Sequence, residues 1–373
     1  MMSFSNRITM RASSVCLLLY LLLKPFYIFH SGSIQPSDFI LLVSFVFLII
    51  QHKGKLIRRI DYSFFLFLVF VLIINLIYGL LYSSANFVWS ILYYVFSFIV
   101  IICFRHYLEE KNYRKGLITV CKINLIVQLL LFVTKIGKYW SGTYRYMGTY
   151  TDPNQMGFAV FSTLAILFLL DSNDRYIYFV ISAFLIFQTA SGGMFVALLI
   201  LVSFDIFVLL KKLLSSTKTI LYAAILFSLI VIVLVLITMG KINVSLGAFR
   251  LEEKMNRNGT IIENYLKDRL LSIVVEQPQF FLVGYGEGPL VSRFGHKGEL
   301  HSTWISLAYY YGIIPFLILL NWIRRNTKDI QYKYIPVYFA LFVEAFTLVN
   351  HRQPAFWMII MLGSLLNRCK KNE

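Results

Sequence analysis

Long apolar runs, separated by short polar segments, constrain this chain more than any other feature. Only 14% of its residues are charged, against roughly 25% in soluble domains. A membrane-spanning helix needs about 20 apolar residues, and several runs are shorter, so we expect their helices to extend into the flanking segments. The runs fall at residues 14–30, 38–51, 61–83, 86–104, 116–134, 156–170, 176–190, 193–210, 219–239, 303–322, 335–350 and 354–367. They predict an all-α, polytopic helical membrane protein of about twelve spans, with residues 1–373 as one integral membrane domain.

The basic residues indicate how such a protein lies in its membrane. The formal net charge is +17, but Lys and Arg occur in short segments between apolar runs, whereas nucleic-acid binding needs them clustered on a polar face. The short loops of one side hold 21 Lys and Arg, and those of the other side hold 4. Because basic loops stay inside, we expect both termini in the cytoplasm, membrane lipid as a partner and no binding to nucleic acid.

This topology predicts two notable outer segments, residues 135–155 and the long loop 240–302. In the long loop, Thr260-Ile-Ile-Glu263 fits a capping box, and apolar residues follow at helical spacing. Pro278 would mark the helix end. We therefore expect one long outward loop that carries a short amphipathic helix on the membrane surface or over a cavity.

Within segment 135–155, Asp152-Pro153-Asn154 is a turn signal. Asp152 and Asn154 are also good helix caps, so a purely structural role is the first alternative for both. Arg145 lies among aromatic residues, and its guanidinium suits phosphate. We predict that Arg145 and Asn154 belong to a substrate-binding site on the outer face.

The remaining candidate residues also lie on the outer side. They are Arg250, Arg257, Arg269, Gly284, Gly286, His301, His351 and Arg352. Three glycines between Gly284 and Gly288 would let the backbone bend closely, and without a βαβ unit they are not a dinucleotide fingerprint. A lone His is more often structural, but His301 stands at a loop-to-membrane edge near several Arg residues.

A site rich in Arg and His with few carboxylates suits a phosphate-bearing anion held by bidentate contacts. Because the outer face lacks an Asp-x-Asp motif, we expect neither a metal nor a cofactor. Release of a pyrophosphate leaving group and uptake of an anion both remain open from the residues alone. Four polar residues inside predicted spans, Lys24, Lys122, Asp205 and Glu344, are further suspects. Glu344 is the deepest of these and would line a cavity if it has a substrate role.

The pattern of motifs resembles the O-antigen polymerase and O-antigen ligase family of bacterial envelope enzymes. His301-Ser302, nine residues and then Gly312 is similar to the family motif, although Pro315 stands at its last position. Pro278 followed by Gly284-Tyr-Gly286 is similar to the proline and paired glycines upstream of that His. Arg145-Tyr-Met-Gly148 with Pro153-Asn154 resembles the family's earlier segment. The motif match covers about 135–160 and 250–315.

The resemblance implies a membrane glycosyltransferase of the GT-C type, inverting and metal-independent, in the bacterial inner membrane. Its substrate would be an undecaprenyl-pyrophosphate-linked oligosaccharide at the outer leaflet, and a chain-length regulator protein would be a further partner. Loop Arg residues, with Arg257 favoured over Arg269 and Arg250, would hold the pyrophosphate, and His301 would orient or deprotonate the acceptor hydroxyl. The loop Ser191-Gly192-Gly193 lacks the Arg that ligases often carry, so a polysaccharide polymerase is favoured. A ligase, or a flippase or transporter, is the alternative.

Overall fold

The computed structural model describes residues 4–29, 33–52, 56–141, 143–170, 172–213, 263, 266–267, 269–288 and 299–371. Its elements are α1 (Phe4–Leu23), α2 (Pro36–His52), α3 (Tyr62–Tyr82), α4 (Asn86–Tyr107), α5 (Lys111–Val133), β1 (Lys138–Tyr139), β2 (Tyr146–Gly148), α6 (Pro153–Leu169), α7 (Arg175–Thr189), α8 (Gly192–Leu213), α12 (Ser272–Glu276), α13 (Phe280–Val283), α15 (Thr303–Tyr311), α16 (Ile313–Thr327), η1 (Tyr332–Tyr334), α17 (Ile335–Glu344) and α18 (Pro354–Lys371). The described chain is thus mostly helical.

Three of the described helices, α3, α4 and α5, are long and apolar enough to cross a membrane. Shorter apolar helices accompany them, among them α2, α6 and α7. Many large apolar side chains on α2 and α3 are exposed, including Leu80 and Leu81. Such a surface is unusual for a protein in water. The fold is that expected of a helical membrane protein, and the predicted span 219–239 lies outside the described residues.

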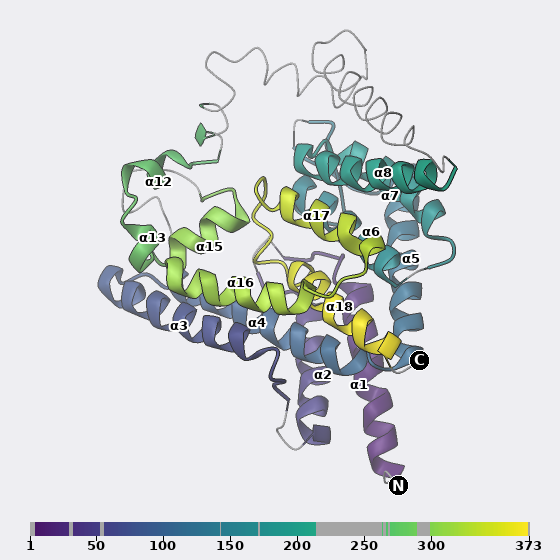
Figure 1. The fold of residues 1–373 in the computed structure, drawn as a ribbon, viewed down its shortest axis with the longest axis horizontal. Coiled ribbons are helices and arrows are strands. Elements are labelled where there is room, and N and C mark those ends of the chain that lie inside the picture. The colour runs from purple at the N-terminus through teal and green to yellow at the C-terminus, as the bar shows by residue number, and fades with distance from the viewer. Residues whose placement is uncertain are drawn as a thin grey trace.

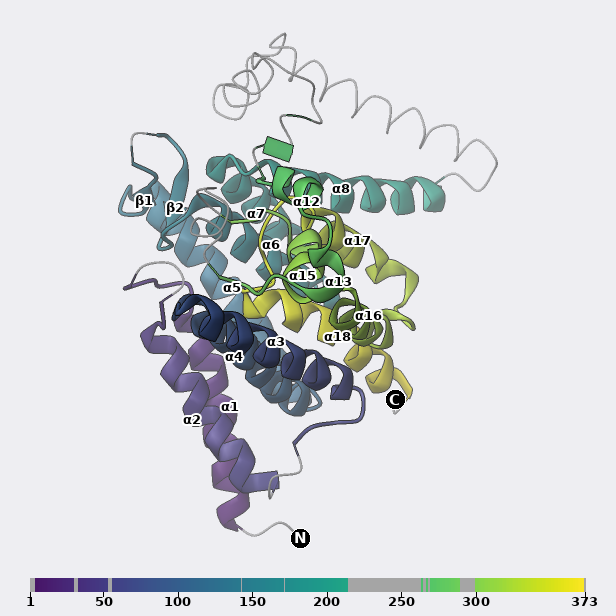
Figure 2. The same ribbon diagram turned by 90° about the vertical axis from the view of Figure 1, so that its left-hand side faces the viewer.

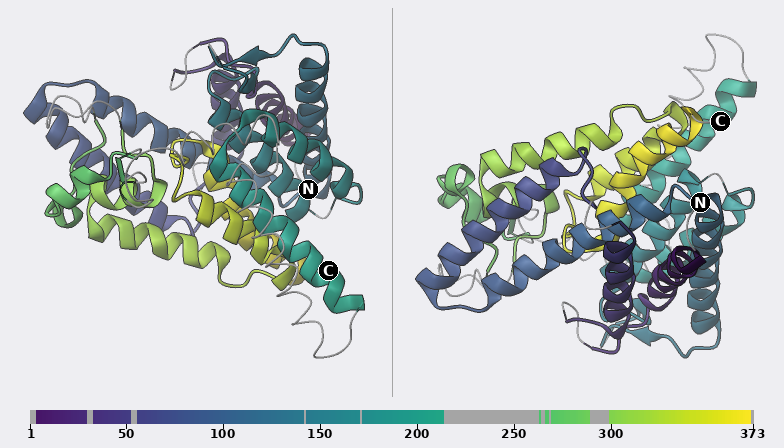
Figure 3. Two further views of the ribbon diagram at one scale, coloured as in Figure 1. Left: turned by 90° about the horizontal axis from the view of Figure 1, so that it is seen from above. Right: turned by 90° about the horizontal axis from the view of Figure 1, so that it is seen from below.

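The helices form crossed groups in space. Helix α3 packs on α4 and α16, and α18 packs on both α4 and α16 (Figure 1). The α1–α2 pair runs away from this group towards the N-terminus (Figure 2). Helices α6, α7, α8 and α17 pack together on the side of the molecule opposite the α1–α2 pair (Figure 3).

Three predicted elements need correction. The span 303–322 is two helices, α15 and α16, which break at Gly312, where φ is +80°. The predicted span 335–350 ends as a helix at Glu344, and residues 345–353 form a loop in which Ala345, Asn350 and His351 are buried. The amphipathic helix is interrupted at Leu270, with φ of +54°, and only five residues continue as α12 before Pro278. Its predicted capping residues 260–262 lie outside the described residues.

The segment 135–155 contains a short hairpin before α6. Strands β1 and β2 pair antiparallel, and Asp152 then caps α6 by accepting from the backbone N–H of Asn154 and Gln155 at 2.7 and 3.1 Å. The predicted capping role of Asp152 is confirmed. Pro153 stands in the first turn of the helix, where its missing N–H has no cost.

A buried ion pair joins four elements in the core. Arg105 and Asp61 are both 1% exposed, with Nε and Oδ2 2.7 Å apart. Arg105 also donates to Ser364 Oγ on α18 and to Asn326 Oδ1 on α16. Trp322 donates to the same carboxylate at 3.1 Å. Because each charge has several partners, the pair fixes how the helices cross.

Candidate functional site

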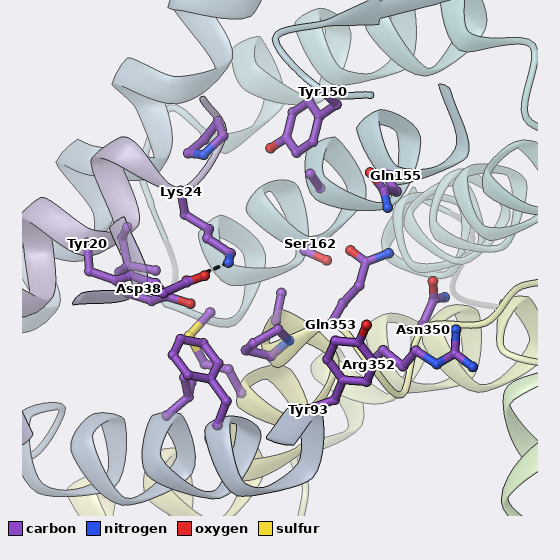
Figure 4. A pocket seen from close by; sticks show the side chains of 18 of the residues that line it. Tyr20, Lys24, Asp38, Tyr93, Tyr150, Gln155, Ser162, Asn350, Arg352 and Gln353 are labelled. Atoms are coloured by element: carbon purple, nitrogen blue, oxygen red, sulfur yellow. Dashed lines mark hydrogen bonds and ion pairs between the residues drawn. The ribbon is translucent and has the colours of Figure 1, made fainter. Parts of the chain in front are cut away.

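A cavity of about 660 Å³ opens where α1, α2, α4, α5 and α6 meet the loop after α17. Polar residues from distant parts of the sequence line it, and Figure 4 labels ten of its lining side chains. The polar and charged residues in the lining include Lys24, Asp38, Asp152, Asn154, Gln155, Glu299, His301, Asn350, Arg352 and Gln353. The cavity therefore brings His301, Asn154 and Arg352, which the sequence predicted for one outer site, onto one surface.

Arg269 holds the backbone of His301. The His301 N–H donates to the Arg269 carbonyl oxygen at 3.1 Å, and the Arg269 guanidinium Nη1 donates to the His301 carbonyl oxygen at 3.1 Å. The imidazole of His301 is exposed and lines the cavity. These two bonds give Arg269 a positioning role for His301, and its predicted binding of pyrophosphate stays a prediction.

Thr303 fastens the start of α15 to the loop after α17. Its N–H donates to the carbonyl oxygens of Ala345 and Leu348 at 2.8 and 3.0 Å. Its hydroxyl donates to the Leu348 carbonyl and accepts from the Asn350 N–H, both at 2.8 Å. These four bonds explain why His301, two residues earlier, lies beside Asn350 and Arg352. A Thr at this place in the His301-Ser302 motif carries no periodic signal, so the sequence did not reveal its role.

Arg352 is held by two carboxylates. Its Nε donates to Glu287 Oε1 at 2.5 Å, and its Nη1 donates to Glu299. A guanidinium has five N–H donors, and within the described chain Nη2 has no hydrogen-bond partner. The side chain is 27% exposed at the cavity. Arg352 can therefore present its Nη2 edge to an oxygen-rich ligand.

Glu287 is the centre of a buried cluster that the sequence did not identify. It is 1% exposed, and its Oε2 accepts from the hydroxyls of Tyr94 and Tyr311 at 2.7 and 2.8 Å. Its backbone N–H donates to Asn75 at 2.8 Å. Burial alone would raise the pKa of the Glu287 carboxyl, but Arg352 and His351 hold that pKa below its ordinary value. Glu287 is therefore an anion that orients Arg352.

The glycine run packs next to this cluster. Gly284 and Gly286 have φ of +83° and +72°, and neither lines the cavity. A Cβ on Gly284 would lie 2.8 Å from the Tyr310 carbonyl oxygen. The N–H groups of Tyr285 and Gly286 both donate to that carbonyl. These glycines pack closely against the α15–α16 break, which delivers Glu287 to Arg352, and their predicted role in substrate binding stays a prediction.

Arg145 and Asn154 do meet, but Arg145 lies outside the cavity lining. The Arg145 Nη2 donates to Asn154 Oδ1 at 2.9 Å, and its Nε donates to the Thr189 carbonyl oxygen at 2.9 Å. The side chain is 6% exposed. Its bonds tie the start of α6 to the end of α7. Asn154 remains at the cavity, oriented by Arg145.

His351 and Glu344 are buried structural neighbours of the cavity. His351 is 0% exposed, with Nε2 3.3 Å from Glu287 Oε1, and its ring stacks on Tyr94. Glu344, also 0% exposed, accepts from the Asn350 side chain. Neither lines the cavity. His351 contacts Glu287, which in turn binds Arg352 at the cavity, and its predicted contact with substrate stays a prediction.

The charges around the cavity differ from the expected Arg- and His-rich site. Its described lining holds the cations Lys24 and Arg352 and the carboxylates of Asp38, Asp152 and Glu299. Lys24 and Asp38 form an ion pair, which spacing alone could not show. Arg250 and Arg257 lie outside the described residues. In the described part of the chain, no three His, Cys, Asp or Glu side chains gather as metal ligands.

No family model matches the chain, and no curated protein sequence matches it. The resemblance of the motifs to a family therefore carries only a proposal.

Proposed function

We propose that the protein is a polysaccharide polymerase of the bacterial inner membrane. It moves a growing glycan from undecaprenyl pyrophosphate onto a lipid-linked repeat unit at the outer leaflet. The chain spans the membrane about twelve times, with both termini in the cytoplasm and the cavity open to the outer side. The observation that supports this most is the convergence of Asn154, His301 and Arg352 on one cavity, because these residues come from three predicted outer segments.

His301 is the proposed base or orienting group for the acceptor hydroxyl. An imidazole suits proton transfer near neutral pH, and His301 is the exposed imidazole in the cavity lining. Attack by that hydroxyl on the anomeric carbon forms the new glycosidic bond and breaks the bond to pyrophosphate. The hydroxyl proton passes to His301, and the electron pair of the broken bond leaves with the pyrophosphate.

The leaving group needs positive charge as it departs. Arg352 supplies guanidinium N–H donors, but Glu287 and Glu299 offset its charge. Pyrophosphate binding therefore requires further cations, and Arg250 and Arg257 of the 240–302 loop are the proposed ones. With these side chains the reaction needs no metal.

A strain that lacks the gene tests the assignment. We expect a gel of its surface polysaccharide to show single repeats in place of long chains, with long chains restored by the wild-type gene. Loss of the single repeats as well would instead favour a ligase or an export role.

A further inference from the structure

The part of the cavity between α1, α2, α5 and α6 carries an ion pair that has donors to spare. Lys24 Nζ lies 2.6 Å from Asp38 Oδ1, and both residues line the cavity. An ammonium has three N–H donors, and Asp38 is the one hydrogen-bond acceptor of the Lys24 ammonium among the described residues. Figure 4 shows this pair on one side of the cavity and Arg352 on the other. The cavity thus has a second polar end.

Two buried oxygen atoms at the same part of the cavity have no hydrogen-bond partner. They are Ser162 Oγ on α6 and Asn124 Oδ1 on α5, and the statement covers the described chain only. Ser162 is 2% exposed. Leaving such groups unsatisfied is costly. In the view of Figure 4, Ser162 projects between the Lys24–Asp38 pair and Gln353. These atoms can therefore bind a ligand that offers hydroxyl groups.

Aromatic rings surround the ion pair. Lys24 Nζ lies 5.5 Å from the ring centroid of Phe96 and 5.9 Å from that of Tyr27. Both rings line the cavity, as do Trp89 and Tyr150. Aromatic faces carry negative charge density and attract polarised C–H groups. Flat apolar faces beside hydrogen-bonding groups are the combination that a pyranose ring requires.

The charge balance favours a neutral ligand at this end. Lys24 and Asp38 cancel each other, and the nearby Gln155 and Gln353 can both donate and accept. An anion would find no excess of positive charge here. A sugar hydroxyl, which also donates and accepts, would satisfy the spare Lys24 donors and the Ser162 oxygen together.

We infer that this end of the cavity is a subsite for a neutral saccharide unit, separate from the His301–Arg352 end. The identity of the saccharide rests on the proposed function, because a polymerase must hold the glycan of the donor and that of the acceptor at once. The lining chemistry itself is independent of the reaction.

Saccharide binding can be measured without turnover. The ligand is the single-repeat oligosaccharide released from the strain's own polysaccharide, without lipid or pyrophosphate. The full chain is placed in lipid nanodiscs, since sugar-headed detergents would compete, and binding is followed by saturation-transfer difference NMR. We expect saturable binding to the wild type and about ten-fold weaker binding for both Lys24→Met and Ser162→Ala.

Lys122→Met is the matched control. Lys122 pairs with Asp174 at 2.5 Å, and its side chain is 23% exposed against 24% for Lys24. Lys122 does not line the cavity, so its loss should leave saccharide binding unchanged. Ser162→Ala removes one oxygen from a residue that bonds to no described side chain, and it therefore tests the subsite even where Lys24→Met fails to fold.

The outcomes separate the subsite from the reaction. Wild-type affinity in Ser162→Ala and in folded Lys24→Met would overturn the subsite, as would a wild type that makes polymer but binds no oligosaccharide. A third outcome is that both variants bind the oligosaccharide more weakly than the wild type, while the wild type makes no polymer. That result would support the subsite and reject the polymerase.

Discussion

Arg352 Nε donates to Glu287 Oε1 over 2.5 Å, although the two residues are 65 positions apart. Two glycines with positive φ precede Glu287 and pack it against the break between α15 and α16. The guanidinium reaches the cavity on one side and this buried carboxylate on the other. The direction in which Arg352 points is thus set by the backbone of the 284–288 turn.

Glu287→Gln should lower the free energy of unfolding by roughly 3 kcal/mol at neutral pH, because it breaks a buried ion pair. The folded-state pKa of Glu287 lies below its ordinary value of 4.5. Its stabilising effect is therefore complete above pH 4.5 and is lost as pH falls from there towards the folded-state pKa. Thermal unfolding of wild type and variant between pH 2 and pH 7 measures this. A difference in Tm that grows as the pH falls would contradict it.

Gly284→Ala should destabilise the protein by more than 1 kcal/mol, in the range of strain at positive φ. The new Cβ would lie 2.8 Å from the Tyr310 carbonyl oxygen. Gly192→Ala is the control, because its Cβ meets nothing within 4 Å in the described chain. Thermal unfolding of the two variants in nanodiscs compares them. Equal Tm values would show that the 284–288 turn does not need glycine.

Thr303→Val keeps the side-chain volume and removes the hydroxyl bonded to Leu348 and Asn350. We expect a loss of about 1–2 kcal/mol in unfolding free energy and shorter polysaccharide chains at a permissive temperature, because His301 loses its alignment with Arg352. The readouts are Tm and a gel of surface polysaccharide. Thr303→Ser, which keeps the hydroxyl, should restore chain length. Full-length polysaccharide chains from Thr303→Val would show that the hydrogen bonds of the Thr303 hydroxyl are not needed for activity.

Arg105→Met should lower the free energy of unfolding by about 3–5 kcal/mol, since it leaves the Asp61 carboxylate buried without its partner. The comparison is Arg58→Met, whose pair with Glu109 is partly exposed at 23% and 45% and is worth at most about 1 kcal/mol. Yield of folded protein and Tm distinguish them. A similar fall in Tm and in folded yield from both substitutions would mean that burial does not set the strength of these ion pairs.

Periodicity and caps predicted much of the local structure, and long-range pairing was not accessible from them. The apolar runs gave helices at α2, α3, α4 and α5 within a few residues, and Asp152 caps α6 as expected. The break at Gly312 was hidden, because Gly inside a long apolar run also fits an unbroken span. Glu287 was hidden because its partners come from α3, α4, α15 and the loop after α17. The one sequence signal that could have singled out Glu287 is its position between two glycines, Gly286 and Gly288.

Three of the predicted site residues meet at the cavity, but its balance of charges and the contacts of the other described candidates were not predicted. His301, Asn154 and Arg352 do share a cavity, which agrees with the prediction that the three lie on the same side. Arg145, Arg269 and His351 instead bind backbone or buried side chains. An Arg is suited to phosphate and equally to carbonyl oxygens, so residue type alone could not distinguish these uses.

Polymer formation by the purified protein tests the central proposal most directly. Wild-type protein in nanodiscs, given lipid-linked single repeats and a metal chelator, should produce a ladder of longer lipid-linked glycans. His301→Ala should bind the same single-repeat oligosaccharide and produce no ladder. A wild type without a ladder, or a ladder of equal length and yield from His301→Ala, would contradict the account.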